Sequence, residues 1–424
     1  MKRFTNARIC TMVDNTPIFH GEILTDQDQI YYVGPQKEWD MEFEEDLDCH
    51  GNLLMPGFKN AHTHSAMTFG RSYADDLPLN QWLFHKIFPL EAHLTPEDQF
   101  YLSQIAILEY LTGGITANFD MYLDTEPHIQ ASELLGFRTV ICGSMNDFGG
   151  TVEEMEQDYD AYHHKSDYIS YEMGFHCETT TNEQRLKEIA ELAHQKKARV
   201  FTHIAEAKED VESCQERNGC SPFVYLDSLG IFDYGGGGFH GVWLDDTDRK
   251  ICKEKEITII TNPCANLKLA SGIPDVLSLY EKGVNLAIGT DGPAGNNGLD
   301  FFKEMYLTAT LPKVFHMDAA AMDASEVLKM ATVGGARAMG LNHCDTLAEG
   351  KAADFIEIDL MQPNMQPIHD LKKNIVYSGS KENVKMTVIG GKILYQDHEF
   401  HLPISVEELY RKCEEITKRI ISSV

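Results

Sequence analysis

Short apolar runs alternate with longer amphipathic segments through the middle of the chain, from residue 58 to about residue 341. This alternation is typical of parallel strands that are joined by helices. We expect strands at residues 53–58, 115–119, 138–142, 171–175, 200–203, 238–240, 257–261 and 285–289. Apolar residues recur at helical spacing at residues 99–111, 182–196, from 211 onward, 274–282, 301–310 and 324–339. Eight strands with intervening helices predict the α/β class and a TIM-like (β/α)8 barrel.

The two ends of the chain have a different pattern, rich in short strands. We expect strands at residues 7–13, 21–24, 30–33 and 53–55, and again at 353–358, 375–377, 385–389 and 392–394. A terminal amphipathic helix is predicted at 405–422, with Ser405 and Glu408 placed as a capping box. Each end alone is small for a stable sheet, so we expect the two to form one composite β-sandwich domain. The predicted segments are 1–57, the barrel at 58–344, and 345–424 with the terminal helix.

Composition places the chain among globular proteins, since 43% of its 424 residues are hydrophobic and 24% are charged. The formal charge of −30 argues against binding to nucleic acid or to an anionic membrane. It also disfavours strongly anionic substrates, unless the pocket is locally positive. The ten cysteines form no Cys-x-x-Cys pair, and the start lacks the apolar stretch of a signal peptide. We therefore expect reduced thiols and a cytoplasmic protein.

Candidate chemistry collects at the predicted strand ends. His62 and His64 follow the first predicted strand with one residue between them, so in extended backbone both imidazoles point to one side. His203, His240 and Asp291 each end a later predicted strand. Alone, such a histidine is more often a satisfied polar residue, and an aspartate before glycine is more often a turn residue.

Together these residues predict a mononuclear metal site, because the carboxyl ends of barrel strands meet at one face. The expected ligands are His62, His64, His203 and Asp291, with one position left for water. Neutral imidazoles suit a single divalent ion, zinc or iron(II), which lowers the pKa of water toward about 7. Asp291 is placed to take the proton of that water and deliver it to a leaving group. Glu206, three residues past His203, is placed to protonate a ring nitrogen, and His240 to bond the attacking oxygen.

Several stretches resemble the amidohydrolase superfamily, and within it the cytosine deaminase-like branch. That branch includes the S-adenosylhomocysteine/5′-methylthioadenosine deaminases, guanine deaminase and the triazine chlorohydrolases. The matching runs are MPGFKNAHTH (55–64), DLPLNQWL (76–83), PLE (89–91), THIAE (202–206), NPCANLKL (262–269), GTDG (289–292) and GKAAD (350–354). The resemblance implies a barrel with a composite β-sandwich, hydrolytic deamination at one zinc or iron ion, and the ligand and acid–base roles given above. The predicted strand at 171–175 has no lysine of the kind that bridges two metals in binuclear relatives.

The resemblance also bears on the substrate. Trp82 and His176 match positions that stack on and hydrogen-bond the substrate in similar nucleoside deaminases, as Glu206 does at the ring. Those relatives hold ribose hydroxyls with a Glu near the tryptophan, and the corresponding residue here is expected to be Asn80. Their arginines for the amino acid carboxylate correspond to Gly143 and Thr151, which disfavours S-adenosylhomocysteine.

We therefore predict a metal-dependent deaminase that acts on an aminopurine nucleoside-like or related N-heterocyclic small molecule and releases ammonia. A cyclic amide hydrolase or a chlorohydrolase using the same site is the alternative, and a non-catalytic scaffold is a remote one. The sequence leaves assembly into a homo-oligomer open. The glycine run at 235–238 precedes a strand, which argues against a phosphate-binding loop.

Overall fold

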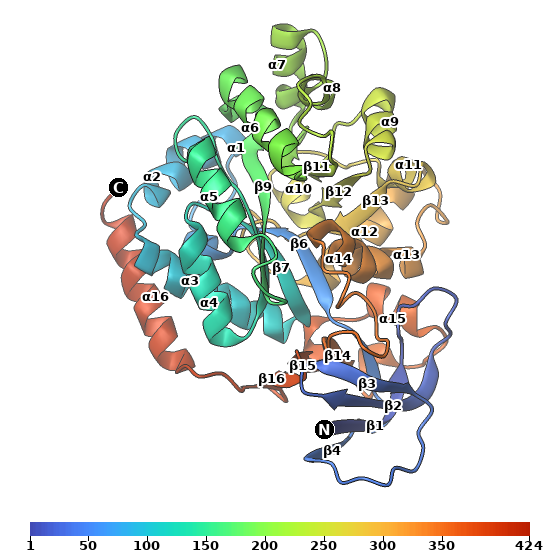
Figure 1. Cartoon of the computed structure of the whole chain (residues 1–424). Helices are drawn as coiled ribbons and strands as arrows, with labels where there is room; N and C mark the ends of the chain where they lie inside the picture. The colour runs from blue at the N-terminus through green and yellow to red at the C-terminus, as the bar shows by residue number, and fades with distance from the viewer.

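The computed structural model describes residues 1–424 and is built around eight parallel strands (Figure 1). They are hydrogen-bonded side by side in chain order. The backbone N–H groups of Thr290 and Asp291 both donate to the carbonyl of His62 at 3.0 Å, which brings the end of the last strand beside the first. The strands are β6 (Phe58–Thr63), β7 (Ile115–Met121), β8 (Arg138–Cys142), β9 (Ile169–Cys177), β10 (Val200–Ile204), β11 (Gly236–His240), β12 (Ile257–Thr261) and β13 (Asn285–Ile288). The predicted barrel is confirmed.

Helices follow the strands and cover the outside of the barrel (Figure 1). The longest, α3, begins at a capping box in which Thr95 and Asp98 satisfy each other's backbone N–H groups. The predicted helix at 324–339 is interrupted by one π-helical turn, Met330–Gly334. The helices are α1 (Leu79–Trp82), α2 (Phe88–Glu91), α3 (Pro96–Thr112), α4 (Thr125–Leu135), α5 (Val152–Tyr162), α6 (Glu183–Lys196), α7 (Lys208–Asn218), α8 (Pro222–Ser228), α9 (Asp246–Glu254), α10 (Pro263–Lys268), α11 (Val276–Glu281), α12 (Phe301–Phe315), α13 (Ala324–Lys329) and α14 (Gly335–Met339).

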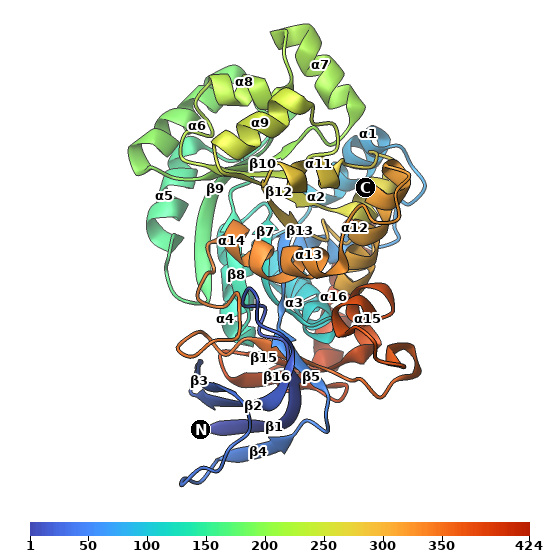
Figure 2. The ribbon, with the colours of Figure 1, turned by 90° about the vertical axis from the view of Figure 1, so that its right-hand side faces the viewer.

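Both ends of the chain join in one nine-stranded sheet below the barrel (Figure 2). The sheet curves so that the rings of Phe4 and Phe355 meet edge to face at 4.9 Å, although β5 lies between their strands. Its strands are β1 (Lys2–Ile9), β2 (Phe19–Asp26), β3 (Gln29–Gly34), β4 (Glu45–Asp48), β5 (Leu53–Pro56), β14 (Phe355–Ile358), β15 (Val384–Ile389), β16 (Lys392–Gln396) and β17 (Glu399–Phe400). A sheet domain composed from both termini is thus confirmed.

The expected single strand at 53–58 is two strands in different sheets. β5 pairs with β1 and β14 in the terminal sheet, and β6 starts the barrel after Gly57. A side chain at position 57 would lie 2.1 Å from the Thr116 methyl carbon, so only glycine lets the chain pass from one sheet to the other. As a result, His62 lies within β6 rather than beyond the strand end.

The expected strand at 375–377 is wrong, since these residues end the helix α15 (Leu371–Tyr377). Asp370 caps this helix by accepting the N–H of Lys373, and its buried residues recur at helical spacing. Three β-prone residues were too few to show that period. The terminal helix α16 (Val406–Ile421) packs against α3, and Ser405 accepts the N–H of Glu408 at its start as expected.

The barrel joins the terminal sheet through a buried ion pair. Arg138, the first residue of β8, donates to both carboxylate oxygens of Asp354, at 2.5 and 3.0 Å. Asp354 also accepts the backbone N–H of Gly390 at 2.8 Å. No helix of this chain has the length and apolarity to cross a bilayer.

Candidate metal and substrate site

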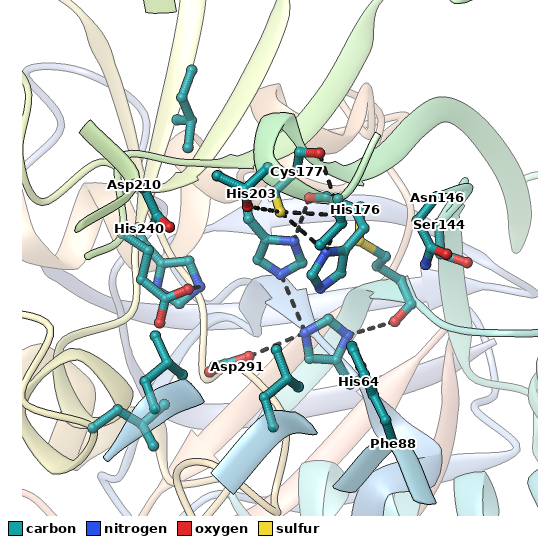
Figure 3. Close-up of a pocket in the computed structure, with 18 of the residues that line it drawn as sticks. His64, Phe88, Ser144, Asn146, His176, Cys177, His203, Asp210, His240 and Asp291 are labelled. Atoms are coloured by element: carbon teal, nitrogen blue, oxygen red, sulfur yellow. Dashed lines mark hydrogen bonds and ion pairs between the residues drawn. The ribbon is translucent and has the colours of Figure 1, made fainter. Parts of the chain in front are cut away.

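The predicted site residues converge at the carboxyl ends of the barrel strands (Figure 3). His62 points from β6 into the barrel mouth, where its ring stacks on Phe239 of β11 at 3.9 Å. His64 follows β6, His203 lies in β10, and Asp291 lies just past β13. His62 and Asp291, which are 229 positions apart in the chain, thus become neighbours, as the barrel topology requires.

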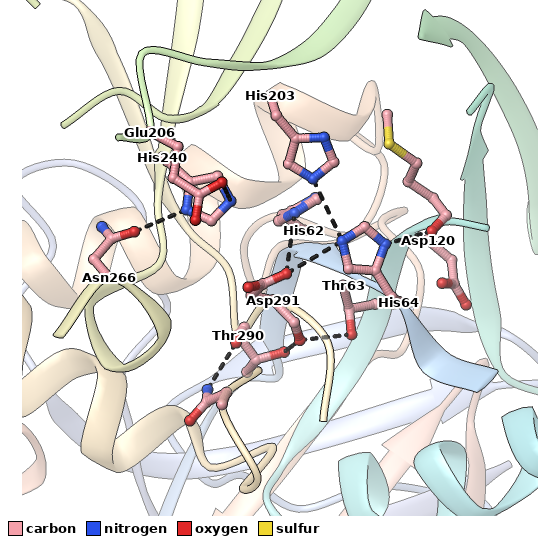
Figure 4. Close-up of polar contacts among 12 residues, drawn as sticks. His62, Thr63, His64, Asp120, His203, Glu206, His240, Asn266, Thr290 and Asp291 are labelled. Carbon is pink, nitrogen blue, oxygen red and sulfur yellow. Dashed lines mark hydrogen bonds and ion pairs between the residues drawn. The ribbon is translucent and has the colours of Figure 1, made fainter. Parts of the chain in front are cut away.

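The ligand atoms of the four predicted residues lie close together. Asp291 Oδ1 lies 3.2 Å from His64 Nε2 and 3.6 Å from His62 Nε2. His203 Nε2 lies 3.4 Å from His64 Nε2. One ligand atom from each of His62, His64 and His203 lies within 4.8 Å of the others, and the same holds for His62, His240 and Asp291 (Figure 4).

The chemistry of these donors fits a cation. His64 Nδ1 lies 2.5 Å from the carbonyl of Met121 and His203 Nδ1 lies 2.7 Å from the carbonyl of His176, so each Nδ1 carries a hydrogen and donates it. In the neutral rings both Nε2 lone pairs then face each other, which is unfavourable unless a positive charge lies between them. Neither ring nitrogen of His62 has a hydrogen-bond partner, although the side chain is fully buried. A divalent ion would satisfy these nitrogens and Asp291 together.

The charges of the cluster are strongly coupled. Burial lowers the pKa of His62 to about 3 and that of His203 well below its ordinary value, so both rings are neutral. Burial opposes the charged form of His64 too, but the hydrogen bond and charge of Asp291 prevail and raise the pKa of His64 to about 9. Burial likewise opposes the ionised form of Asp291, but its contacts with His62 and His64 hold its pKa well below the usual range. A bound cation would compete with a proton for the Nε2 lone pair of His64.

Glu206 and His240 form a second group beside the first. Glu206 Oε2 lies 3.7 Å from His240 Nε2, and Glu206 Oε1 accepts the hydroxyl of Ser271 at 3.3 Å. His240 Nδ1 donates to Asn266 Oδ1 at 2.8 Å (Figure 4). With its hydrogen on Nδ1, the ring can present an Nε2 lone pair to the cavity. Burial raises the pKa of the Glu206 carboxyl, which favours its protonated form.

The backbone is constrained at the same points. Ala205, His240 and Asp291 adopt φ values of 48°, 71° and 59°, which non-glycine residues rarely do. Each lies at or just past the end of a barrel strand. Such conformations cost free energy and persist where the surrounding structure fixes them, and they cluster at functional sites.

A buried polar network supports the turn that carries His64. Asp120 in β7 accepts the backbone N–H of Ser65 at 2.9 Å and lies 3.0 Å from His128 Nδ1. Asn118 donates to both Ser65 Oγ and the Asp120 carboxylate. The network thus fixes Ser65, the residue after His64. The carbonyl of Met121, the residue after Asp120 in β7, accepts the Nδ1–H of His64.

The cavity above these residues has a volume of about 1190 Å³, open mouth included. Trp82, His176 and Asn80, which the sequence analysis proposes as substrate-binding residues, all line this cavity. Trp82 is buried, whereas Asn80 is exposed at the rim. His176 Nδ1 bonds Thr180 Oγ1 at 2.8 Å, and burial lowers the His176 pKa to about 4.

Sequence reasoning missed a buried carboxyl in the cavity wall, that of Glu91. It ends α2, and burial raises its pKa to about 7. Glu91 lies in the matched run PLE, but no role was assigned to it because the position expected for a hydroxyl-binding acid was Asn80. Gly143 and Thr151 do not line this cavity, whereas Ser144 and Asn146 do. No periodicity marks these loop residues in the sequence.

A parallel barrel that gathers three imidazoles and a carboxylate at its carboxyl-terminal face is the architecture of a metal-dependent hydrolase. Comparison with known families agrees, since residues 53–394 match the amidohydrolase family. The chain belongs to the amidohydrolase family, and the resemblance noted from its motifs is confirmed.

The similar proteins cover nearly the whole chain. A 5-methylthioadenosine/S-adenosylhomocysteine deaminase of Caldanaerobacter subterraneus subsp. tengcongensis is 35% identical over 98% of both chains. A 5′-deoxyadenosine deaminase of Methanosarcina mazei is 34% identical, again over 98% of both. The solved structure of an adenosine deaminase from Xanthomonas campestris with bound zinc is 28% identical, covers 100% of both chains and has a TM-score of 0.92.

Proposed function

We propose that this protein is a metal-dependent aminohydrolase that replaces the 6-amino group of an aminopurine nucleoside with a carbonyl oxygen and releases ammonia. The convergence of His62, His64, His203 and Asp291 beside Glu206 and His240 is the observation that carries the proposal. Family membership and the deaminase relatives give the wider class, a hydrolase acting on carbon–nitrogen bonds of cyclic amidines. The enzyme uses one divalent metal, as the zinc in the similar adenosine deaminase structure supports.

The four ligand side chains would hold that metal. When bound, it would supply an electrophilic centre that lowers the pKa of a water molecule toward neutrality. Asp291 has one carboxylate oxygen, Oδ1, directed at the imidazoles. We propose that its second oxygen, Oδ2, accepts the proton that is released as water adds to C6. Oδ2 would then transfer this proton to the departing amino group.

Glu206 and His240, which lie beside the proposed metal ligands, would also act on the substrate. Burial raises the pKa of Glu206 and so favours a proton on its carboxyl, which would donate to the ring nitrogen next to C6 and make that carbon more electrophilic. His240 Nε2 would accept a hydrogen bond from the attacking water and direct its oxygen toward C6. Asn266 holds the tautomer that this requires.

The remaining lining residues would bind the rest of the nucleoside. The carboxyl of Glu91 is suited to accept hydrogen bonds from sugar hydroxyls, a role that the sequence suggested for Asn80. Trp82 offers an aromatic face to the purine, and His176 offers a neutral ring nitrogen to it. The substrate is then a small heterocycle enclosed at the barrel mouth.

An ammonia-release screen on zinc-loaded protein tests the proposal. Adenosine, 5′-deoxyadenosine and 5′-methylthioadenosine should each release one ammonia and give the corresponding inosine. Guanine and cytosine serve as comparison substrates in the same assay, and chlorinated triazines are assayed for chloride release. Chloride release without turnover of any 6-aminopurine nucleoside would contradict the proposal and favour the chlorohydrolase alternative.

A further inference from the structure

The substrate cavity has acidic side chains but no lysine or arginine. Its lining includes five carboxylate residues and four histidines among 28 residues. The carboxylates are Glu91, Glu178, Glu206, Asp210 and Asp291. A neighbouring cavity that shares Tyr122, Leu123 and Ser144 with it also has no cationic residue in its lining.

Two arginines contact lining residues, and both are already engaged outside the cavity. Arg217 binds both carboxylate oxygens of Glu178 at 2.8 Å, so it neutralises that acid and leaves no donor pair for a ligand. Arg185 donates to the carbonyls of Asn146 and Gly150, and therefore braces the loop after β8 from its outer side. Neither guanidinium lines the cavity.

Two carboxylates remain without a cationic partner away from the reacting atoms. Asp210, at the start of α7, accepts the backbone N–H of Ala207 and forms no ion pair with lysine or arginine. Glu91 in α2 likewise has no lysine or arginine among the charged groups that act on it. Between them the wall is largely apolar, with Leu79, Leu83 and Phe88 among its residues.

From this charge distribution we infer that the enzyme selects its nucleoside substrate by the charge of the 5′ substituent. It accepts neutral or cationic substituents and rejects a carboxylate or phosphate. The inference rests on the proposed nucleoside deaminase function, but it does not depend on one binding pose. Away from the proposed metal ligands, an anionic substituent loses its hydration and finds no lysine or arginine in the cavity lining, while Asp210 adds a carboxylate without a cationic partner. Like charges at about 7 Å in a partly hydrated pocket weaken binding by about 10- to 100-fold.

Three thioether nucleosides with neutral, cationic and anionic 5′ substituents test this effect, and the two charged substituents match each other in length. They are 5′-methylthioadenosine, 5′-(3-aminopropylthio)-5′-deoxyadenosine and 5′-(2-carboxyethylthio)-5′-deoxyadenosine. We expect kcat/KM for the first two to agree within about tenfold and to fall by about 10- to 100-fold for the carboxylate. Calorimetric Kd values on the Glu206→Gln variant should follow the same order without turnover.

A designed cation tests where the discrimination arises. Thr179 is exposed and lines the cavity, so Thr179→Arg places a guanidinium at the mouth. In this variant, the ratio of kcat/KM for the methylthio nucleoside to kcat/KM for the carboxylate nucleoside should fall to less than half of its wild-type value. The matched control is Gln184→Arg, which adds the same charge to an exposed position of α6 outside the cavity. This control should leave the kcat/KM ratio of the two nucleosides unchanged.

The outcomes separate this inference from the proposed function. Equal binding of the anionic and neutral nucleosides, or equal effects of Thr179→Arg and Gln184→Arg, would overturn the charge selection. Binding in the predicted order without ammonia release would support charge selection and contradict the deaminase proposal. Failure of all three nucleosides to bind would overturn both.

Discussion

Asn266→Ala tests how the protein prepares His240 for its role. The Asn266 amide accepts the His240 Nδ1–H at 2.8 Å, and both side chains are buried. Losing one partner of a buried hydrogen bond costs about 1–3 kcal/mol. If that bond sets the tautomer and direction of His240 in the transition state, kcat should fall by about 5- to 150-fold. Metal content should stay at one ion per chain, because Asn266 contacts none of the proposed ligands in the polar network.

The assay is steady-state ammonia release together with metal analysis of the same preparation. Asn266→Asp keeps an acceptor oxygen for Nδ1 and should recover part of the loss. The control is Asn262→Ala, which removes another buried asparagine beside α10 whose side-chain atoms have no hydrogen-bond partner. An unchanged kcat in Asn266→Ala, or a loss of kcat that only follows loss of metal, would refute the reasoning.

Three further predictions concern metal binding, stability and pH. Asp120→Ala removes the acceptor of the Ser65 N–H and should weaken zinc binding by about 10- to 100-fold in a chelator competition, whereas unchanged affinity would show that the turn needs no such support. Arg138→Met leaves Asp354 buried without its partner and should lower the free energy of unfolding by about 3–5 kcal/mol in urea; an effect no larger than that of the exposed Lys187→Met control would contradict this. Because the pKa of Glu206 is raised, its acid form persists above the usual carboxyl range and is lost as pH rises through that pKa. The value of kcat/KM should therefore fall on the alkaline side of its pH profile. A profile that keeps rising there would argue against Glu206 as the proton donor.

The barrel was predictable because its signals are local and repeated. Each strand is an apolar run, and each following helix has its own period and caps, as in α6 with Asn182 at its start. The two wrong strand predictions lie where a single residue alters the local structure. Gly57 divides one apolar run between two sheets, and Asp370 starts a helix that its last three residues do not reveal.

The convergence of the proposed ligands was predictable for a related reason. Their residue types are rare together at strand ends, and a barrel brings all strand ends to one face. The substrate side of the cavity was not predictable in this way. Glu91 reaches the site from a short helix after β6, and its burial depends on packing against distant loops. Likewise, the engagement of Arg217 by Glu178 pairs residues 39 positions apart, which no sequence period indicates.

The central claim is that one divalent ion is held by His62, His64, His203 and Asp291. Anomalous diffraction from crystals of the purified protein, recorded at the absorption edge of the metal it contains, tests this most directly. The account predicts one ion per chain, bonded to Nε2 of the three histidines and to the Asp291 carboxylate, and its loss together with ammonia release in His203→Ala. An ion bound elsewhere, or full activity in metal-free protein, would contradict it.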